Sequence, residues 1–413
     1  MSKKRVVITG SGVASPIGND VETYCQNLYQ GRYAIGPITT YNTSKYKTRL
    51  GACLDPIPRP TCLNPLEEKM SSKLSLLSLF CAEQAILQAE LDFSQEDAKR
   101  SGVIIGSGFL NLYDLEHFYQ AFYQREQPAP PTLIPINMGN APASRIAMTY
   151  GLNGVIKCVT TACSAGFTAL VDSVQLIRDG YQDIIITGGS DLSICETIIH
   201  AWERMRVLTK EKNNPALACR PFDKDRRGIV LGDGSAVFVL ESYEHATQRG
   251  ATILAEISGI FQNSDSLDLV KPNSKHEAYC IEQAIQQANL QPTDIGMIYA
   301  HATGTRLNDT TEYQSLWTVF KEQLPEIPVC GLKSMLGHTI GASGPMSLVA
   351  ALETLRVGNF YPIPNLVHLE DGINLLITKT GQTLPHVQHV LINTFAFGGI
   401  NVCLIISNLG EKS

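Results

Sequence analysis

The sequence predicts an α/β protein with largely parallel sheets. Apolar strand segments alternate with amphipathic helical segments through the whole chain. Several of these strands, such as 183–189, are apolar at every position instead of alternating with polar residues, so we expect helices to cover both faces of the sheet. The 413 residues can bury a large core and suggest two or three domain-sized units. We place the boundary near Gly250, which gives an N-terminal half, 1–250, and a C-terminal half, 251–413.

The first half begins with a predicted strand at 6–9, a glycine-rich turn and the start of a helix. The segment from Gly10 to Ser15 is similar to a dinucleotide-binding fingerprint, but Ser15 stands at the third glycine, and no acidic residue follows a second strand, so this site is disfavoured. We expect further strands at 102–106, 154–160, 183–189 and 235–241, and helices at 69–91, after Cys163 and at 244–249. Residues 35–70 are proline-rich and expected to be irregular, and residues 110–140 are expected to be an insertion that packs on a partner. Residues 220–228 form a charged loop, for which a surface lattice of salt bridges is the ordinary explanation.

The second half repeats the alternation, although no repeat is visible residue by residue. Strands are expected at 253–260, 297–300, 329–332, 389–394 and 402–407, and helices at 276–289, 309–321 and 342–358.

Composition excludes several classes of protein. The net charge of −6 disfavours non-specific nucleic-acid binding, and no apolar run is long enough to span a membrane. The chain opens without a signal-peptide pattern, and its 11 cysteines include no Cys-x-x-Cys pair. We therefore expect a soluble cytoplasmic protein with reduced thiols and no zinc site.

Cys163 lies where the strand 154–160 ends and a helix begins. A thiol at that position faces unpaired backbone N–H groups and the positive end of the helix dipole, which favours the thiolate. The alternative is a buried, inert cysteine, and this stretch by itself does not separate the two.

Three later stretches also carry chemically useful residues. His301 directly follows an apolar strand, Lys333 and His338 share a glycine-rich loop, and Phe397 precedes a double glycine at a strand end. Each has an ordinary structural explanation: a hydrogen-bonded core histidine, a helix-capping loop and a tight turn.

Taken together and in this order, these motifs resemble the β-ketoacyl-acyl carrier protein synthases, most closely synthase II and the ketosynthases of type II polyketide and aryl-polyene systems. The resemblance spans the chain and is carried by Thr161-Ala162-Cys163, Arg220 to Asp223, Leu231 to Gly234, His301 to Thr305, Lys333 to His338, and Asn393 to Asn401.

The resemblance implies a thiolase-like fold, with two similar halves stacked as a five-layer αβαβα sandwich. It implies acyl transfer to Cys163, followed by decarboxylative Claisen condensation with a malonyl thioester. His301 and His338 would stabilise the enolate, Lys333 would orient His301, and the backbone N–H groups of Cys163 and Phe397 would form the oxyanion hole. No metal or organic cofactor is expected, because the substrates arrive on the phosphopantetheine arm of an acyl carrier protein.

The resemblance also implies substrate and partner contacts. Thr303 and Thr305 match pantetheine-binding positions, Phe397 matches a gating aromatic, and Phe395 joins the substrate-binding set. Phe109 and Trp202 fall at acyl-pocket positions, where large rings would shorten the pocket or favour a flat chain. Arg206 and Lys69 are candidates for carrier docking, with solvated surface charges as the alternative. A homodimer, or a heterodimer with a ketosynthase-like chain-length partner, is expected.

Four residues depart from the family pattern: Ala302 for glycine, Ser347 for a glutamate that supports the lysine, Glu68 for a docking arginine, and Val270 for threonine. We therefore favour a specialised polyketide or polyene ketosynthase over a housekeeping fatty-acid synthase II. A non-catalytic chain-length partner is disfavoured, since such partners lack the cysteine. The starter unit, the chain length and the identity of the two subunits stay open.

Overall fold

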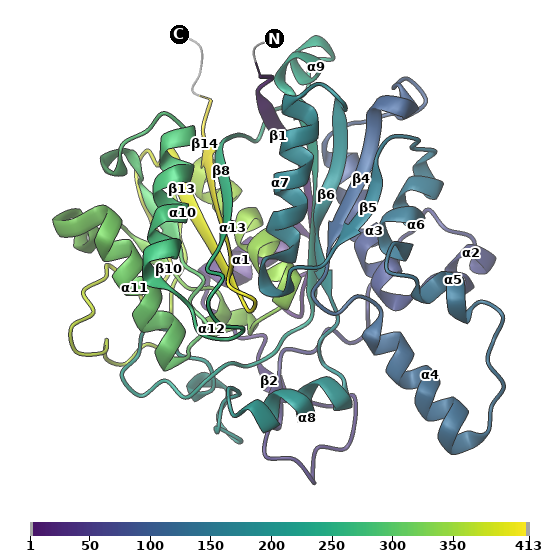
Figure 1. Ribbon diagram of the computed structural model, residues 1–413, viewed down its shortest axis with the longest axis horizontal. Coiled ribbons are helices and arrows are strands. Elements are labelled where there is room, and N and C mark those ends of the chain that lie inside the picture. Colours follow the sequence, from purple (N-terminus) through teal and green to yellow (C-terminus); the bar gives the residue numbers. More distant parts are fainter. Residues whose placement is uncertain (1–2, 410–413) are drawn as a thin grey trace.

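The computed structural model describes residues 3–409 as an α/β fold built on one mixed sheet (Figure 1). Ten strands are hydrogen-bonded in the order β10-β9-β13-β14-β8-β1-β7-β6-β4-β5. Two further two-stranded sheets pair β2 (Gly36–Pro37) with β3 (Leu50–Gly51), and β11 (Asn359–Phe360) with β12 (Gln382–Thr383).

The main sheet consists of two five-stranded parts with the same topology. The first part, in the order β5-β4-β6-β7-β1, contains β1 (Val6–Ala14), β4 (Ser101–Gly106), β5 (Ile156–Val159), β6 (Ile184–Asp191) and β7 (Gly234–Ser242). The second, in the order β10-β9-β13-β14-β8, contains β8 (Ala255–Ser264), β9 (Met297–Tyr299), β10 (Val329–Cys330), β13 (His389–Ala396) and β14 (Ile400–Ser407). Since each part uses its strands in the same chain order, the fold repeats a topology that is not visible residue by residue.

The expectation of largely parallel sheets is wrong. In each part the three outer strands are parallel, whereas the inner pairings, including the short β1–β8 junction, are antiparallel. The alternation of strands and helices along the chain indicates crossovers, but it does not tell which strands become neighbours.

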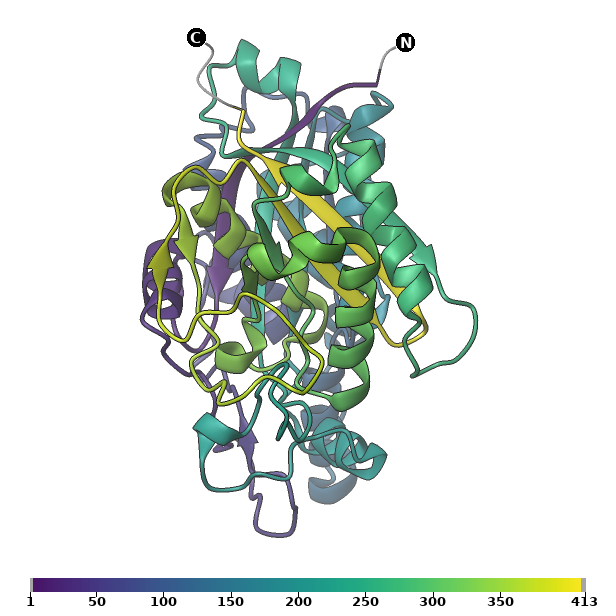
Figure 2. The same cartoon turned by 90° about the vertical axis from the view of Figure 1, so that its left-hand side faces the viewer.

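Helices occupy three layers around the two parts of the sheet (Figure 1). The central layer contains α7 (Ala165–Arg178) and α13 (Ser343–Val357), and the outer layers contain α3 (Lys73–Gln88) and α6 (Ala141–Tyr150) on one side, and α10 (Ser274–Gln287) and α11 (Arg306–Phe320) on the other. Figure 2 shows the second outer layer in front of the yellow strands β13 and β14. The expected five-layer arrangement is confirmed.

The largest hydrophobic core lies between the two parts of the sheet. It joins fully buried Phe167 of α7 and Leu348 of α13 to Phe238 of β7 and Leu404 of β14. Because the central helices are apolar on the sides that face both parts, neither half can bury its inner surface without the other.

The predicted turn after residue 9 does not form. Strand β1 continues from Val6 to Ala14, and its glycines serve close packing: a Cβ on Gly10 would lie 2.0 Å from the Ala85 oxygen, and one on Gly12 2.0 Å from the Cys81 oxygen. Helix α3 therefore sits directly on β1, and the glycine-rich segment is not a dinucleotide loop.

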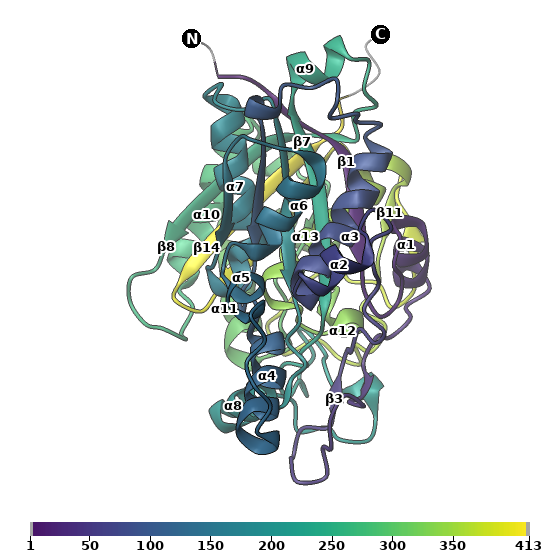
Figure 3. The ribbon, with the colours of Figure 1, turned by 90° about the vertical axis from the view of Figure 1, so that its right-hand side faces the viewer.

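One helix continues the helix start expected near residue 20, whereas several other helices of the first half were not expected. Helix α1 (Val21–Tyr29) begins at Asp20, whose side chain accepts from the Thr23 N–H, and α8 (Glu196–Met205) begins at N–H groups that the Glu116 carboxylate accepts from. Glu116 lies on α4 (Leu112–Arg125), which with α5 (Leu133–Asn137) forms the expected insertion and projects from the first half (Figure 3). The remaining short helices are α2 (Pro65–Lys69), α9 (Tyr243–Gln248) and α12 (Lys333–Leu336).

Within residues 3–409, no helix combines the length and apolar character that crossing a membrane requires. All eleven cysteines are free thiols.

Candidate active site

Cys163 lies in a short 3-10 turn, Ala162–Ser164, between β5 and α7, as the sequence predicts. This junction packs against the second half of the chain. A Cβ on Gly166 would lie 2.4 Å from the Gly341 oxygen, and one on Gly189 2.3 Å from the same atom. The two glycines therefore allow the loop that carries His338 to approach the start of α7.

The His338 loop is also held by backbone hydrogen bonds to the first half. The His338 N–H donates to the Val230 oxygen, and the Gly232 N–H donates to the His338 oxygen at 3.0 Å. This pairing brings His338 Nε2 within 3.0 Å of Cys163 Sγ, although the residues are 175 positions apart.

Backbone geometry fixes the tautomer of His338. The Ile340 N–H points at His338 Nδ1, at 3.2 Å. An amide N–H can only donate, so Nδ1 is an acceptor and the proton of the neutral ring is on Nε2. Burial and the Lys333 charge lower the pKa of His338 well below its usual value, so the ring is neutral and presents an Nε2–H donor to the cavity.

His301 is held in a similar way by Lys333. Lys333 Nζ donates to the His301 carbonyl oxygen and lies 3.5 Å from Nδ1 of the same residue. Burial, Lys333 and His338 lower the pKa of His301, and its ring centroid is 5.5 Å from that of His338. With the ammonium group beside Nδ1, the Nε2 of His301 carries the ring proton.

The expectation that the helix dipole favours a Cys163 thiolate does not hold for the buried sulfur. Burial raises the pKa of Cys163 to about 11, and the Lys333 charge and the Phe397 N–H offset this only in part. The resting sulfur is a thiol, which must lose its proton as it attacks. The Phe397 N–H, expected as an oxyanion-hole donor, does interact with this sulfur.

Two buried carboxylates that the sequence interpretation missed hold the site together. Asp191 accepts from the N–H groups of Gly108, Phe109 and Gly341, so it links both halves behind Cys163. Burial raises its pKa to about 6. Its position at the end of an apolar strand, two residues after a double glycine, was an available signal.

Glu312 is the second of these carboxylates. It accepts from the His301 and Ala302 N–H groups at 2.7 and 2.8 Å, and its charge favours the protonated form of Lys333. Burial raises the pKa of Glu312 and lowers that of Lys333. Ser347 lies half-buried on α13, and the negative charge near Lys333 comes from Glu312 instead. A buried acid in the middle of an otherwise ordinary helix gives no local signal.

Three residues that flank the catalytic candidates have left-handed backbone conformations. The φ angles are +50° for Ala162, +46° for Ala302 and +49° for Ile340. Such a conformation costs a non-glycine residue about 1–2 kcal/mol. Ala302 therefore adopts the conformation that explains a glycine in the family motif, and its methyl group is fully buried. Strain of this kind is common where a site fixes the direction of side chains.

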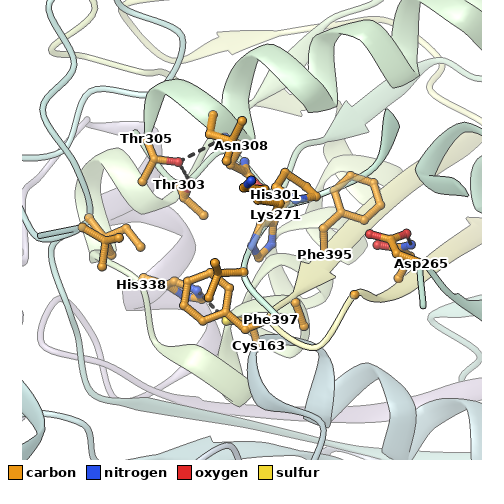
Figure 4. Close-up of a pocket in the computed structure, with 18 of the residues that line it drawn as sticks. Cys163, Asp265, Lys271, His301, Thr303, Thr305, Asn308, His338, Phe395 and Phe397 are labelled. Atoms are coloured by element: carbon orange, nitrogen blue, oxygen red, sulfur yellow. Dashed lines mark hydrogen bonds between the residues drawn. The ribbon is translucent and has the colours of Figure 1, made fainter. Parts of the chain in front are cut away.

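A narrow cavity of about 180 Å³ leads to Cys163, His301 and His338 (Figure 4). Thr303, Thr305, Phe395 and Phe397 also line it, as predicted, and Val270 lies at its wall. The two threonine hydroxyls are 3.0 Å apart. The structure therefore brings three of the expected catalytic residues and most of the expected substrate contacts to one cavity, with Lys333 bonded to His301.

The expected acyl-pocket residues pack together beside this cavity. The Trp202 and Phe397 rings stack with centroids 5.5 Å apart and an interplanar angle of 15°, and Phe109 belongs to the same apolar cluster. Trp202 and Phe397 line the Cys163 cavity and also belong to this cluster, so the cluster forms part of the cavity wall.

The two docking candidates lie in different places. Arg206 is exposed beside Val207, which lines the cavity, whereas Lys69 is exposed at the end of α2 and lines none of the cavities described here. The 220–228 segment is not the expected surface loop, because the Arg226 guanidinium is fully buried and donates to the backbone oxygens of Thr305 and Arg306. It thereby supports the segment that follows His301.

Cys163, His301 and His338 place potential metal-ligand atoms within 4.8 Å of one another. A histidine ligates through a nitrogen without a proton, whereas the groups around Nδ1 place the proton of each ring on Nε2. The arrangement therefore suits hydrogen-bond donation better than metal binding.

Family models match this chain over most of its length. The model described as Beta-ketoacyl synthase, N-terminal domain, matches residues 3–246, and the C-terminal domain model matches residues 254–367. The chain belongs to the β-ketoacyl synthase family. The resemblance drawn from the motifs is confirmed, and so is the enzyme class, an acyltransferase of the ketosynthase type.

Known ketosynthases agree with this assignment. The 3-oxoacyl-[acyl-carrier-protein] synthase 2 of Synechocystis sp. (strain ATCC 27184 / PCC 6803 / Kazusa) is 33% identical over 98% of both chains. Two solved structures superpose closely. One is a type II polyketide ketosynthase, AntDE, in complex with its acyl-carrier protein AntF, with TM-score 0.89, 26% identity and coverage of 99% of this chain and 100% of that one. The other is the ishigamide ketosynthase/chain length factor, with TM-score 0.90, 29% identity and the same coverage. The thiolase-like fold is thereby confirmed.

Proposed function

We propose that this ketosynthase condenses a Cys163-bound acyl group with a malonyl thioester carried by an acyl carrier protein. One observation supports this most directly. A nucleophilic sulfur and two imidazoles that present Nε2–H groups meet at the end of a narrow cavity, with Cys163 Sγ 3.0 Å from His338 Nε2.

In the first step, Cys163 Sγ attacks the carbonyl carbon of the incoming acyl thioester. The new bond to Sγ forms, and the oxyanion accepts hydrogen bonds from the backbone N–H groups of Cys163 and Phe397. The bond to the pantetheine sulfur then breaks. The pantetheine sulfur leaves with the proton that the Cys163 thiol gives up. Because burial raises the pKa of Cys163 to about 11, the sulfur reacts as a thiol that loses its proton during the attack.

In the second step, a malonyl thioester occupies the same cavity. Its bond to the carboxylate breaks and CO2 leaves, and the electron pair becomes an enolate whose oxygen accepts from Nε2 of His301 and His338. The enolate carbon then attacks the acyl carbon, and Sγ leaves as thiolate. Each well-placed donor lowers the barrier of such a step by about 3–4 kcal/mol.

The chemistry above uses only the residues of this chain and a carrier-bound thioester, so we propose that no metal or organic cofactor takes part. Lys333 acts as a positioning residue. It holds the His301 ring through Nδ1 and the backbone oxygen, and it keeps the potential positive where the enolate develops.

A specialised pathway is our preferred assignment. Trp202 narrows the route to the apolar cluster, and Ala302, Ser347 and Glu68 depart from the pattern expected of a housekeeping enzyme. The matched AntDE and ishigamide ketosynthases favour this assignment, whereas the Synechocystis relative favours the alternative of a fatty-acid synthase II. A non-catalytic chain-length subunit is disfavoured, because the chain has the nucleophile Cys163 and the donors His301 and His338.

We propose that the protein is cytoplasmic, where its eleven thiols stay reduced. We also propose that it forms a dimer along β5. In the described chain β5 bonds only to β4 and ends the sheet, whereas the opposite edge, β10, is covered by the segment around Leu376. An open sheet edge beside the projecting α4 suits pairing with a second ketosynthase chain, either the same or a chain-length partner.

Substitution of the nucleophile tests the reaction. The Cys163→Gln variant is expected to lose condensation entirely while it still decarboxylates malonyl carrier protein, because both imidazole donors stay in place. Product analysis by mass spectrometry measures both reactions, and Cys62→Ala, at an exposed thiol, is the control. Continued chain elongation by Cys163→Gln would show that another group is the nucleophile.

The trapped acyl group identifies the pathway. After incubation with a mixture of acyl carrier proteins, the mass added to Cys163 names the starter unit. Full-rate elongation of long-chain acyl groups on a fatty-acid carrier would contradict the specialised assignment.

A further inference from the structure

The first turn of helix α8 is capped by a side chain from another helix. Cys195 precedes α8, and its side chain makes no capping hydrogen bond. Instead, the Glu196 and Thr197 N–H groups donate to the two carboxylate oxygens of Glu116, at 2.9 and 2.8 Å. Glu116 is buried on α4, 80 positions before Glu196, and α4 lies beside α8 (Figure 3). Such a carboxylate satisfies free N–H groups and interacts favourably with the helix dipole.

The core of the first half holds Glu116 in place. Helix α4 begins at buried Asn111, whose side chain accepts from the Ser72 hydroxyl at 2.8 Å. Farther along α4, Asp114 accepts from the Lys73 N–H at the start of α3, at 3.0 Å. Because α3 packs directly on β1, the position of Glu116 is fixed relative to the main sheet.

Glu116 also fixes the direction of α8. The chain enters this helix through Ser193 and Ile194, whose N–H groups donate to buried Asp233 at 2.7 and 3.0 Å. The next support is Glu116, which holds the first turn from the side of α4. Near the other end of α8, Glu203 accepts from two backbone N–H groups of the mostly exposed segment between β2 and β3. Loss of the Glu116 bonds would leave the entry in place and allow the helix to tilt about it.

The buried face of α8 carries Trp202. Its ring stacks on Phe397 with centroids 5.5 Å apart, and both rings line the Cys163 cavity. The Trp202 backbone lies about 9 Å along the helix axis from Glu196, so a tilt of about 10° at the first turn moves it by about 1.5 Å. A gap of that size removes much of the contact energy between two packed rings.

We propose that Glu116 is a positioning residue for acyl-chain selection, which fixes α8 so that the Trp202 ring stays on Phe397 and limits the length of the bound acyl chain. This inference rests on the proposed function. Glu116 is not among the residues that line the cavity. The malonyl step uses His301 and His338, which lie on other elements, so we expect Glu116 to act on selectivity and not on decarboxylation.

Glu116→Gln tests this role. The amide keeps the shape of the side chain and one acceptor oxygen, but it turns an NH2 group toward one of the two N–H donors. The protein receives malonyl carrier protein and an equal mixture of hexanoyl and dodecanoyl carrier proteins, and mass spectrometry measures the products. The ratio of long-chain to short-chain kcat/KM is expected to rise by about three- to tenfold. Malonyl decarboxylation by Glu116→Gln/Cys163→Gln is expected to match that of Cys163→Gln.

A double-variant cycle separates positioning from general support of the fold. In a Trp202→Leu background the ring is absent, so Glu116→Gln is expected to leave the ratio unchanged there. Glu126→Gln, at the exposed end of α4, is the matched control and is expected to keep the original ratio.

Four results would overturn the proposal. These are an unchanged ratio in Glu116→Gln, the same rise in the Trp202→Leu background, a similar rise in Glu126→Gln, and a parallel loss of malonyl decarboxylation, which would make Glu116 a support of the whole fold. If the unchanged protein elongates neither acyl chain and releases no CO2 from malonyl carrier protein, the proposed function itself fails, which is a distinct result.

Discussion

Cys163 and His338 come together because small residues let two backbones touch. Gly166 and Gly189 leave room for the Gly341 oxygen, and the His338 segment pairs with Val230 to Gly232. The Ile340 N–H then sets the direction of the His338 ring, and the Lys333 ammonium group sets that of the His301 ring. The site therefore depends on preorganised donors more than on charged side chains.

Removal of one donor tests this view. His338→Ala is expected to lower the rate of malonyl decarboxylation by about 10²–10³-fold, because one Nε2–H no longer supports the enolate. The rate is best measured as CO2 release in the Cys163→Gln background, which isolates this step from acyl transfer. His386→Ala, at an exposed histidine, is the control. A loss below tenfold would contradict the role of His338 as a donor.

The stack of Trp202 on Phe397 predicts a short acyl pocket. Trp202→Leu keeps the site apolar but removes the ring, so kcat/KM for long relative to short acyl chains is expected to rise by about 10–200-fold. Competition between acyl carrier proteins of different chain length measures the ratio. Trp317→Leu, at the half-exposed second tryptophan on α11, is the control. An unchanged ratio would show that the pocket limit lies elsewhere.

At the scale of single elements, a charged cluster joins β7 to α9. Glu241 of β7 is buried and accepts from Arg249, His245 and Thr9, and His245 also contacts Glu96. Hydrogen bonds to the two carboxylates raise the pKa of His245 above its ordinary value of 6.5. Hydrogen bonds and charge lower the pKa of Glu241 to about 2.

This cluster predicts how stability depends on pH. Because the folded-state pKa of His245 is raised, its contribution is complete below pH 6.5 and disappears as pH rises through the folded value. The contribution of Glu241 is present above pH 4.5 and disappears as pH falls toward 2. His245→Gln is therefore expected to lower the free energy of unfolding most below pH 6.5 and least at high pH. Denaturant unfolding at several pH values measures it, with His386→Gln as control. A difference independent of pH would contradict this account.

At the scale of the whole molecule, two halves of one topology meet at the site. Cys163 follows the edge strand of the first half, and His301 and Lys333 follow the corresponding outer strands of the second half. The shared core between α7 and α13 fixes the halves relative to each other, so neither half holds a complete site.

The free edge of the sheet predicts how the molecule dimerises. The Val155 and Val159 oxygens bond toward β4, and neighbouring residues of a strand bond in opposite directions, so the backbone N–H of Cys158 faces outward. Cys158→Pro removes this donor and leaves the bonds to β4 intact. Its dimer dissociation constant in analytical ultracentrifugation is expected to rise at least tenfold, whereas Cys158→Ala changes it little. An unaffected dimer would place the interface elsewhere.

The sequence by itself determined most strands and helices, the position of Cys163 at a strand–helix junction, and the motif set that names the family. These features are local: periodicity, caps and short motifs depend on residues close together in the chain. It also predicted several of the residues that line the cavity, because each motif of this family has the same role in different members.

Only the tertiary structure decided which strands are neighbours, that β1 runs through its glycines, and that Arg226, Asp191 and Glu312 are buried supports of the site. A buried charge is stabilised by partners far away in the chain, and a strand accepts parallel or antiparallel neighbours with the same side-chain pattern. Apart from the position of Asp191 at a strand end, local sequence therefore predicts neither these buried charges nor the direction of neighbouring strands. The packing of the two halves decides both.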